Sequence, residues 1–240
     1  MAKEPQKIGL ITTTSLVIGN MIGAGIFVLP AALAKYGSIS LLGWLFSAAG
    51  ALILAKIFSN FSVILAGKSG GPYAYSRAGF GDFIGFLVAW GYWVSCWVGN
   101  AAIAVAVISA LSFFFPVLET NPAYGVILGL SLRWLFTWVN SRGLKESGKI
   151  QVFTTVLKLA PLVFVIIMGL FFFQLDNFPA FNLTAESNFA IFPVVAVLTL
   201  YAFLGIESAT IPAENVENPE VTVPRATMFG TIINTLVLFL

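Results

Sequence analysis

Two charged residues lie inside long apolar stretches of the chain, where a charge is expensive. Lys158 interrupts the stretch 148–175, and Glu207 interrupts the stretch 189–211. An ionisable side chain near the centre of a bilayer costs at least about 2.5 kcal/mol on insertion scales, and it usually faces a cavity or a partner. We therefore interpret Glu207 as functional rather than as a helix-end residue that reaches water. Lys158 is interpreted either as a group that exchanges protons or as a fixed cation bonded to backbone carbonyls.

Glycine-rich interruptions occur in two of the apolar stretches. The first contains Gly19, Gly23 and Gly25, and the second contains Gly205 two residues before Glu207. Glycine weakens a helix by about 1 kcal/mol relative to alanine, and unwound backbone in a membrane must be buried in protein or line a polar cavity. Paired breaks of this kind are typical of transporters in which half-helix ends bind the substrate. The alternative for the first stretch is close helix packing through its Gly-x-x-x-Gly pattern.

A third candidate binding region combines small polar and aromatic residues. Ser95, Cys96 and Asn100 lie among tryptophans, and Cys96 and Asn100 are four residues apart, which places them on one helix face. An amide oxygen there can bind a cationic substrate tail, helped by cation–π contact with an aromatic ring. The alternatives are an interhelical hydrogen bond for Asn100 and interfacial anchoring for the tryptophans.

The composition identifies the elements that must hold these residues. Of 240 residues, 59% are hydrophobic and only 9% are charged, whereas soluble domains are about one-quarter charged. The chain is therefore predicted to be an integral membrane protein. It has no histidine and one cysteine, which excludes histidine-based triads, zinc clusters and intramolecular disulfides. We expect no enzyme activity, no cofactor, no metal and no nucleic-acid partner.

A membrane helix needs about 20 mostly apolar residues, and on that basis we expect an all-α membrane protein with a single transmembrane domain over residues 1–240. The last apolar run is too short to cross a bilayer, so the domain is expected to be truncated there. The predicted spans are 8–34, 38–66, 83–115, 123–140, 148–175, 189–211 and 227–240.

The basic residues predict the orientation of these spans. Lysine and arginine concentrate in cytoplasmic loops, and eight of them fall on the side of the N-terminus against Lys35 alone on the other side. This distribution predicts a cytoplasmic N-terminus. The eight residues are Lys3, Lys7, Lys68, Arg77, Arg142, Lys145, Lys149 and Arg225.

Four segments resemble the basic amino acid/polyamine antiporters of the amino acid–polyamine–organocation superfamily, especially its exchangers of arginine for agmatine. The segments are 19–30 (GNMIGAGIFVLP), 70–75 (GGPYAY), 92–100 (YWVSCWVGN) and 203–209 (FLGIESA). The resemblance covers nearly the whole chain, and its third segment is the most specific. It implies a LeuT-like inverted-repeat fold, here incomplete: the first five-helix repeat, the sixth helix and part of the seventh. It also implies a homodimer whose C-terminal half lies outside the chain.

The resemblance further implies roles for individual residues. Amides around Met21, Ala24 and Gly25 would receive the substrate carboxylate, and carbonyls near Met21, Tyr201 and Leu204 would hold its amino group. These assignments agree with the positive end of a half-helix facing an anion.

The same resemblance assigns the rest of the substrate site and the gate. Ser95, Cys96 and Asn100 would meet the cationic tail, and Ile103 and Leu204 would pack along its aliphatic part. Tyr73 matches a tyrosine implicated in acid sensing, and Glu207 matches an acidic gate residue.

Three positions depart from the arginine/agmatine exchangers. Ala24 replaces a serine, Tyr201 replaces a tryptophan that stacks on the substrate cation, and Lys158 replaces a neutral residue. Lys158 instead resembles the fifth-helix lysine of proton-coupled members of the superfamily.

The sequence thus predicts a secondary transporter that exchanges an amino acid, with arginine as one candidate, for a related amino acid or an agmatine-like amine by alternating access. One alternative is a proton-coupled amino acid symporter that uses Lys158. Another is a truncated membrane protein that does not transport, and we expect the isolated chain to move no substrate because half of its gate is missing.

Overall fold

The structure is a computed structural model that describes residues 7–23, 25–172, 174 and 178–239. Within these residues the regular elements are helices, together with one isolated parallel β-bridge between Ile8 and Val216. The helices are α1 (Leu10–Met21), α2 (Gly25–Ala34), α3 (Ile39–Ile64), α4 (Pro72–Phe80), α5 (Asp82–Ser112), α6 (Val117–Thr120), α7 (Pro122–Ser141), α8 (Leu144–Phe171), α9 (Asn188–Tyr201), η2 (Ile206–Ala209), η3 (Ala213–Asn215) and α10 (Pro219–Phe239). The all-α prediction is confirmed.

Six segments in the described part of the chain are long and apolar enough to cross a membrane. Five of them correspond to the predicted first, second, third, fifth and sixth spans, and the chain is a multi-pass membrane protein. The predicted fourth span, 123–140, coincides with α7, which does not meet the same criterion. The six segments are Leu10–Ala34, Ile39–Ile64, Asp82–Ser112, Glu146–Phe171, Asn188–Ala209 and Pro219–Phe239.

The last helix differs from the prediction. The apolar run 227–240 was expected to be too short to cross, but α10 begins at Pro219 and has 21 residues. Its first turn contains Glu220, and Pro224 lies inside the helix. Acidic residues favour a helix N-terminus, and proline is favoured at the first helical position, which Pro219 occupies. A count of apolar residues alone therefore placed the start of this helix too late.

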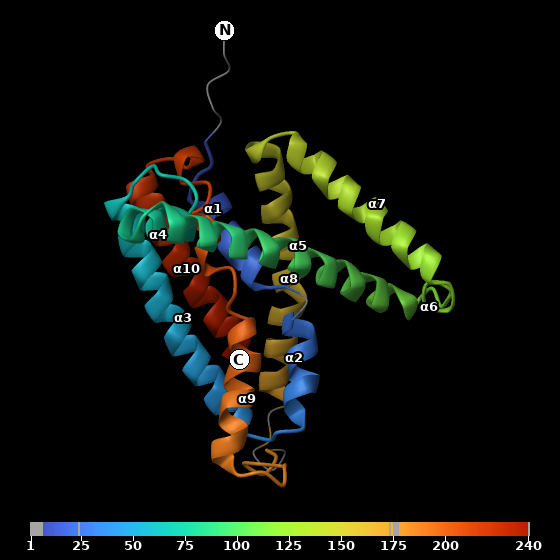
Figure 1. Cartoon of the computed structure of the whole chain (residues 1–240). Helices are drawn as coiled ribbons and strands as arrows, with labels where there is room; N and C mark the ends of the chain where they lie inside the picture. Colours follow the sequence, from blue (N-terminus) through green and yellow to red (C-terminus); the bar gives the residue numbers. More distant parts are fainter. Residues whose placement is uncertain (1–6, 24, 173, 175–177, 240) are drawn as a thin grey trace. The chain divides into compact units, whose positions relative to one another are not determined.

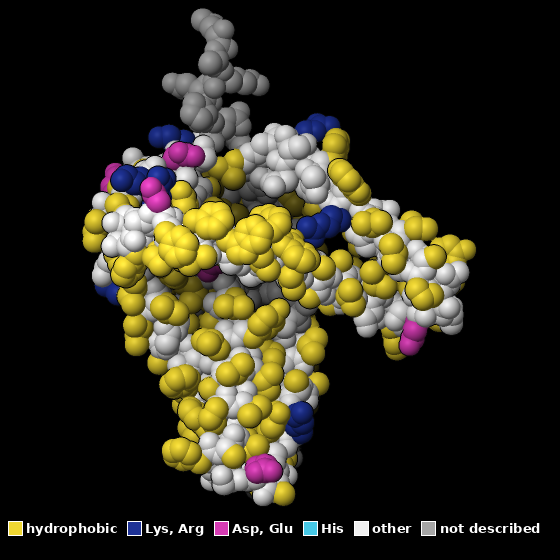
Figure 2. Space-filling model, in the orientation of Figure 1, with side chains coloured by type: hydrophobic (Ala, Val, Ile, Leu, Met, Phe, Trp, Pro, Cys, Tyr) yellow, Lys and Arg dark blue, Asp and Glu magenta, His cyan; other side chains and the backbone are white. Residues whose placement is uncertain are grey.

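The chain divides into two compact units. The first contains residues 1–72 and 148–240, and the second contains residues 73–147. In the first unit α3, α9 and α10 lie side by side (Figure 1). Hydrophobic side chains cover most of the face that α3 and α9 present in Figure 2, as a lipid-facing surface requires.

Small residues bring the helices of the first unit close together. A side chain added at Gly43 of α3 would collide with Val195 of α9, and one added at Gly230 of α10 would come within 2.6 Å of Val17 Cβ in α1. Beside Gly43, the buried Ser47 hydroxyl lies 2.8 Å from the Thr199 hydroxyl. Membrane helices associate through small residues and interhelical hydrogen bonds of this kind.

The segments at the two ends of this bundle are held by backbone hydrogen bonds. At one end the Ile8 amide donates to the Asn215 carbonyl at 2.9 Å, and the Glu217 amide donates to the Ile8 carbonyl at 3.0 Å. At the other end the Ile39 amide donates to the Phe181 carbonyl at 2.7 Å. These bonds hold the starts of α1 and α3 in place, and so they determine how far along the bundle each residue of those helices lies.

The second unit contains α4 to α7. Gly125 and Gly129 of α7 lie against Ile108 of α5, which sets the close approach of these two helices. α4 and α5 are joined through Gly81, whose φ of 85° favours glycine. This unit carries the predicted residues on α4 and α5.

Replacing Gly230 by alanine tests the packing of α1 on α10. The new methyl group would lie 2.6 Å from Val17 Cβ, and the backbone must move to relieve that contact. We expect unfolding to become easier by about 1–3 kcal/mol, the usual cost of overpacking. Thermal unfolding in detergent measures the change. Gly50→Ala in α3, where an added methyl meets nothing within 4 Å, is the matched control and should not lower stability.

Candidate functional site

The predicted break in the first span is present in the structure. α1 ends at Met21, α2 begins at Gly25, and Ile22 has a non-helical backbone with φ −78° and ψ 79°. The Ile22 amide still donates to the Ile18 carbonyl at 2.8 Å, whereas the Gly23 amide turns to the Met21 carbonyl at 2.9 Å. The end of α1 therefore leaves backbone carbonyls that need other donors.

Lys158 of α8 supplies two of those hydrogen bonds. Its Nζ donates to the Gly19 carbonyl at 2.9 Å and to the Ile22 carbonyl at 3.1 Å. The C-terminal end of a helix carries a partial negative charge, which a cation stabilises. Of the two interpretations drawn from the sequence, the geometry matches the cation bonded to carbonyls of the broken helix.

Two further side chains of α8 bind α1 in the same way. Gln151 Nε2 and Thr155 Oγ1 donate to the Ser15 carbonyl at 3.1 and 3.2 Å. With Lys158 they follow the spacing i, i+4, i+7, which is one face of a helix. Neither residue was predicted from the sequence, although a polar stripe along an otherwise apolar span is a signal for such residues.

Gly19 allows the polar side chains of α8 to approach α1. A side chain at Gly19 would collide with the Gln151 amide and would come within 2.8 Å of Thr155 Oγ1. From the sequence, Gly19 was interpreted as part of a helix break, with close helix packing as the alternative, and the structure matches the alternative at this residue. In the structure Gly19 lies within α1, and its missing side chain leaves room for the polar face of α8.

The second predicted break is also present, and it touches the first. α9 ends at Tyr201, and the 3-10 helix η2 begins at Ile206 after Gly205, whose φ is 110°. A side chain at Gly205 would lie 3.0 Å from the Asn20 carbonyl carbon and 3.1 Å from the Met21 amide nitrogen. Only glycine combines this backbone conformation with this close approach.

The predicted substrate residues of the first unit gather around the two breaks. Met21 is buried at the end of α1, and Gly25 begins α2. A Cβ at Gly25 would lie 3.2 Å from the Tyr201 ring, so this ring lies beside the start of α2. Tyr201 and Leu204 are 56% and 59% exposed, which leaves them accessible to a ligand. Ala24 lies outside the described residues.

The remaining predicted substrate residues lie along α5 in the second unit. The Asn100 side-chain nitrogen donates to the Cys96 carbonyl at 2.7 Å, which points the amide oxygen away from the backbone as an acceptor. Ser95 Oγ donates to the Tyr92 carbonyl at 2.9 Å. Cys96, Asn100 and Ile103 follow helical spacing and are all exposed.

The predicted gate residues also have defined surroundings. Glu207 lies in the first turn of η2, half-buried, and its carbonyl accepts hydrogen bonds from the Thr210 amide and hydroxyl at 2.8 and 2.6 Å. Its position at the span-six break agrees with the prediction.

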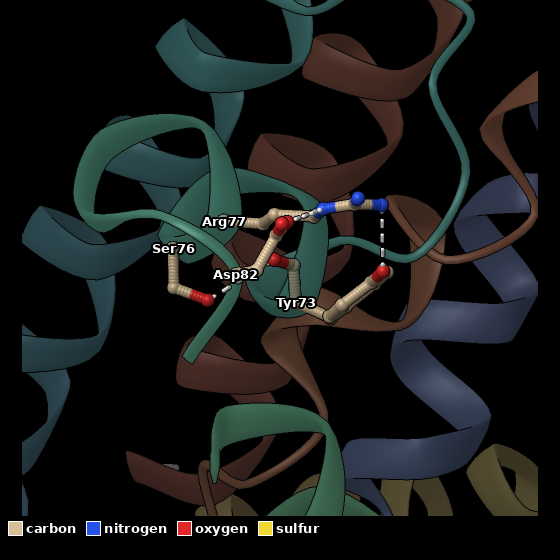
Figure 3. A network of polar contacts seen from close by, with 4 residues as sticks. All are labelled: Tyr73, Ser76, Arg77 and Asp82. Carbon is tan, nitrogen blue, oxygen red and sulfur yellow. Dashed lines mark hydrogen bonds and ion pairs between the residues drawn. The ribbon is translucent and has the colours of Figure 1, made fainter. Parts of the chain in front are cut away.

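Tyr73 belongs to a polar network at the junction of α4 and α5 (Figure 3). Arg77 donates to the Tyr73 hydroxyl at 3.1 Å and to Asp82 at 2.6 Å. These hydrogen bonds, first that to Asp82 and then that to Tyr73, raise the pKa of Arg77 above its ordinary value. Arg77 therefore stays charged, and it orients the Tyr73 hydroxyl.

Comparison with known proteins identifies the family. The family model described as "Amino acid permease" matches residues 8–240. The chain belongs to the amino acid permease family. This family is part of the amino acid–polyamine–organocation superfamily, so the resemblance read from the four segments is confirmed, and the LeuT-like fold class follows from the membership.

Several curated relatives of this chain carry the names of antiporters. It is 40% identical to the arginine/ornithine antiporter of Pseudomonas aeruginosa over 99% of the chain and 51% of that protein. It is 38% identical to the cadaverine/lysine antiporter of Escherichia coli K12, over 94% of the chain and 50% of the relative. It is 35% identical to the arginine/agmatine antiporter of Chlamydia trachomatis, over 93% of the chain and 48% of that protein. The chain spans about half the length of these relatives.

Gly205→Ala tests whether the two broken spans depend on each other. Alanine would have to adopt a φ of 110° and place its methyl group 3.0 Å from Asn20. We expect a loss of about 1–3 kcal/mol in unfolding free energy, the usual cost of a strained backbone position. Faster amide hydrogen exchange near Asn20 should accompany it. Gly169→Ala in α8, where the added methyl meets nothing within 4 Å, should change neither measurement.

Proposed function

We propose that this permease chain belongs to a secondary transporter that exchanges a cationic amino acid for a related amino acid or amine across the cell membrane. The observation that carries the proposal is the contact of two broken spans at Gly205 and Asn20. A transporter binds substrate at such breaks because half-helix ends offer unpaired backbone groups to its charged atoms. The antiporter names of the relatives support the same activity.

The substrate carboxylate binds at the N-terminus of α2. Free amides and the positive end of the helix dipole favour an anion there. Gly25 opens this helix, and the Tyr201 ring beside it provides an aromatic face for the substrate. The amino group binds the carbonyls near Met21, Tyr201 and Leu204.

The cationic tail of the substrate binds α5. The Asn100 oxygen, oriented by the hydrogen bond of its amide nitrogen to Cys96, is a suitable acceptor for a guanidinium or ammonium group. Ser95 and Cys96 complete this polar part of the site, and Ile103 contacts the aliphatic chain.

The two breaks act as hinges for alternating access. Glu207 and Tyr73 take part in gating, and the chain uses no covalent chemistry, cofactor or metal. It is not an enzyme. The distribution of lysine and arginine places the N-terminus in the cytoplasm, and the functional assembly is a homodimer of complete transporters.

The test is exchange in liposomes by a chimera that joins this chain to the C-terminal half of the arginine/ornithine antiporter of P. aeruginosa. We expect uptake of arginine, ornithine or lysine only when the liposomes contain an exchangeable cationic amino acid or amine. Gly25→Ala should reduce that uptake about tenfold, equivalent to about 1.4 kcal/mol, because its methyl group would lie 3.2 Å from the Tyr201 ring. Gly23→Ala, whose methyl meets nothing within 4 Å, should not.

Two results would contradict the proposal. A chimera that is monodisperse and inserted but moves none of these substrates would exclude exchange at this site. Uptake driven by a pH gradient alone, without internal substrate, would instead indicate a proton-coupled symporter. In that case Lys158→Ala should abolish the response to the pH gradient.

A further inference from the structure

Asn234 of α10 is completely buried, yet its amide has no protein partner among the described residues. Its exposed fraction is 0%, and neither Nδ2 nor Oδ1 makes a hydrogen bond there. The side chains of the other buried polar residues of this helix are hydrogen-bonded to the backbone one turn earlier. Thr227 donates to the Val223 carbonyl at 2.9 Å, and Thr231 donates to the Thr227 carbonyl at 2.8 Å. Asn234 therefore differs from these threonines in having no partner for its buried amide among the described residues.

The packing of α10 on α1 fixes the level of this amide. The two helices run in the same direction, as the parallel bridge before them and their successive contacts indicate. Gly230 lies against Val17, and one turn further along each helix come Asn234 and Met21. Beyond them Val237 and Leu238 pack on the cluster of Ile18, Ile22 and Ile26. Asn234 is thus level with the end of α1, at the break.

The break determines which ligand fits the amide. An asparagine side chain has two donor hydrogens and one acceptor oxygen, and a buried amide without partners costs several kcal/mol. The last turn of α1 has carbonyls that lack intrahelical donors. A cation would be repelled, because Lys158 already places an ammonium group on Gly19 and Ile22 of the same break. Water both donates and accepts, and it has no charge.

We propose that Asn234 forms a buried water-binding site at the span-one break, in which one water molecule joins its amide to the backbone at the end of α1. The site adjoins the substrate-binding region proposed around α2 and Tyr201, which also uses carbonyls near Met21, and it does not depend on the transport activity. The water completes from the side of α10 the hydrogen bonding that Lys158, Gln151 and Thr155 provide from the side of α8. The broken segment is therefore held on two sides.

Radiolytic labelling of the 240-residue chain in nanodiscs tests this site. A short X-ray pulse produces hydroxyl radicals from bound water where it lies, and these oxidise nearby methionines. Met21 is only 4% exposed, so radicals from bulk solvent do not reach it. We expect rapid oxidation of Met21 in the wild type that persists when a scavenger removes radicals from the bulk. Slow oxidation of Met21, or its loss with the scavenger, would overturn the proposal.

Variants of α10 make the test specific. Asn234→Leu keeps a similar shape without the amide, and it should slow Met21 oxidation about tenfold. Thr231→Val, which removes a hydroxyl already bonded within the helix, should not change the rate. Exposed Met168 should be oxidised equally in all proteins, and a monodisperse elution profile verifies folding. An unchanged Met21 rate in Asn234→Leu contradicts the water site, and so does a Met21 rate that falls when sodium replaces choline, since that indicates a cation.

Discussion

A helix that stops inside a membrane must find donors for its last carbonyls, and Lys158 meets this requirement for α1. Its ammonium group binds the Gly19 and Ile22 carbonyls, while Gln151 and Thr155 bind the carbonyl one turn earlier. Bilayer lipid offers no hydrogen bonds to replace these contacts. The break can therefore persist because α8 presents a polar face to it.

The same constraint bears on the substrate site proposed at the two broken spans. Gly205 lets the second break approach Asn20 and Met21 without a side chain between them, and Tyr201 lies beside the start of α2. Once Lys158 satisfies the negative end of α1, the positive end of α2 remains available to a carboxylate. The exposed Tyr201 ring lies beside that end. In the proposed function, the substrate carboxylate binds the start of α2, whereas Lys158 stabilises the end of α1.

Much of this arrangement could be predicted from the sequence because glycine patterns and isolated charges are conspicuous in an apolar chain. The breaks near Gly19–Gly25 and at Gly205 were predicted, as was the bonding of Lys158 as one of two alternatives. Gln151, Thr155 and Asn234 were not, because a polar residue that binds another helix is recognised only when that helix is in place. The start of α10 was misplaced since its first turns are polar. Residues of α5 share a helix face as predicted, but spacing alone cannot determine what that face contacts.

Amide hydrogen exchange at the span-one break, measured in nanodiscs, tests the central role of Lys158 most directly. The Ile22 and Gly23 amides are hydrogen-bonded in the structure, and hydrogen bonds to charged groups contribute about 1.5–3 kcal/mol. Lys158→Met, which keeps the length of the side chain but not its donors, should accelerate exchange of both amides at least about tenfold. Lys56→Met, at an exposed position in α3, should leave them unchanged. Equal protection of Ile22 and Gly23 in the wild type and in Lys158→Met would contradict the account.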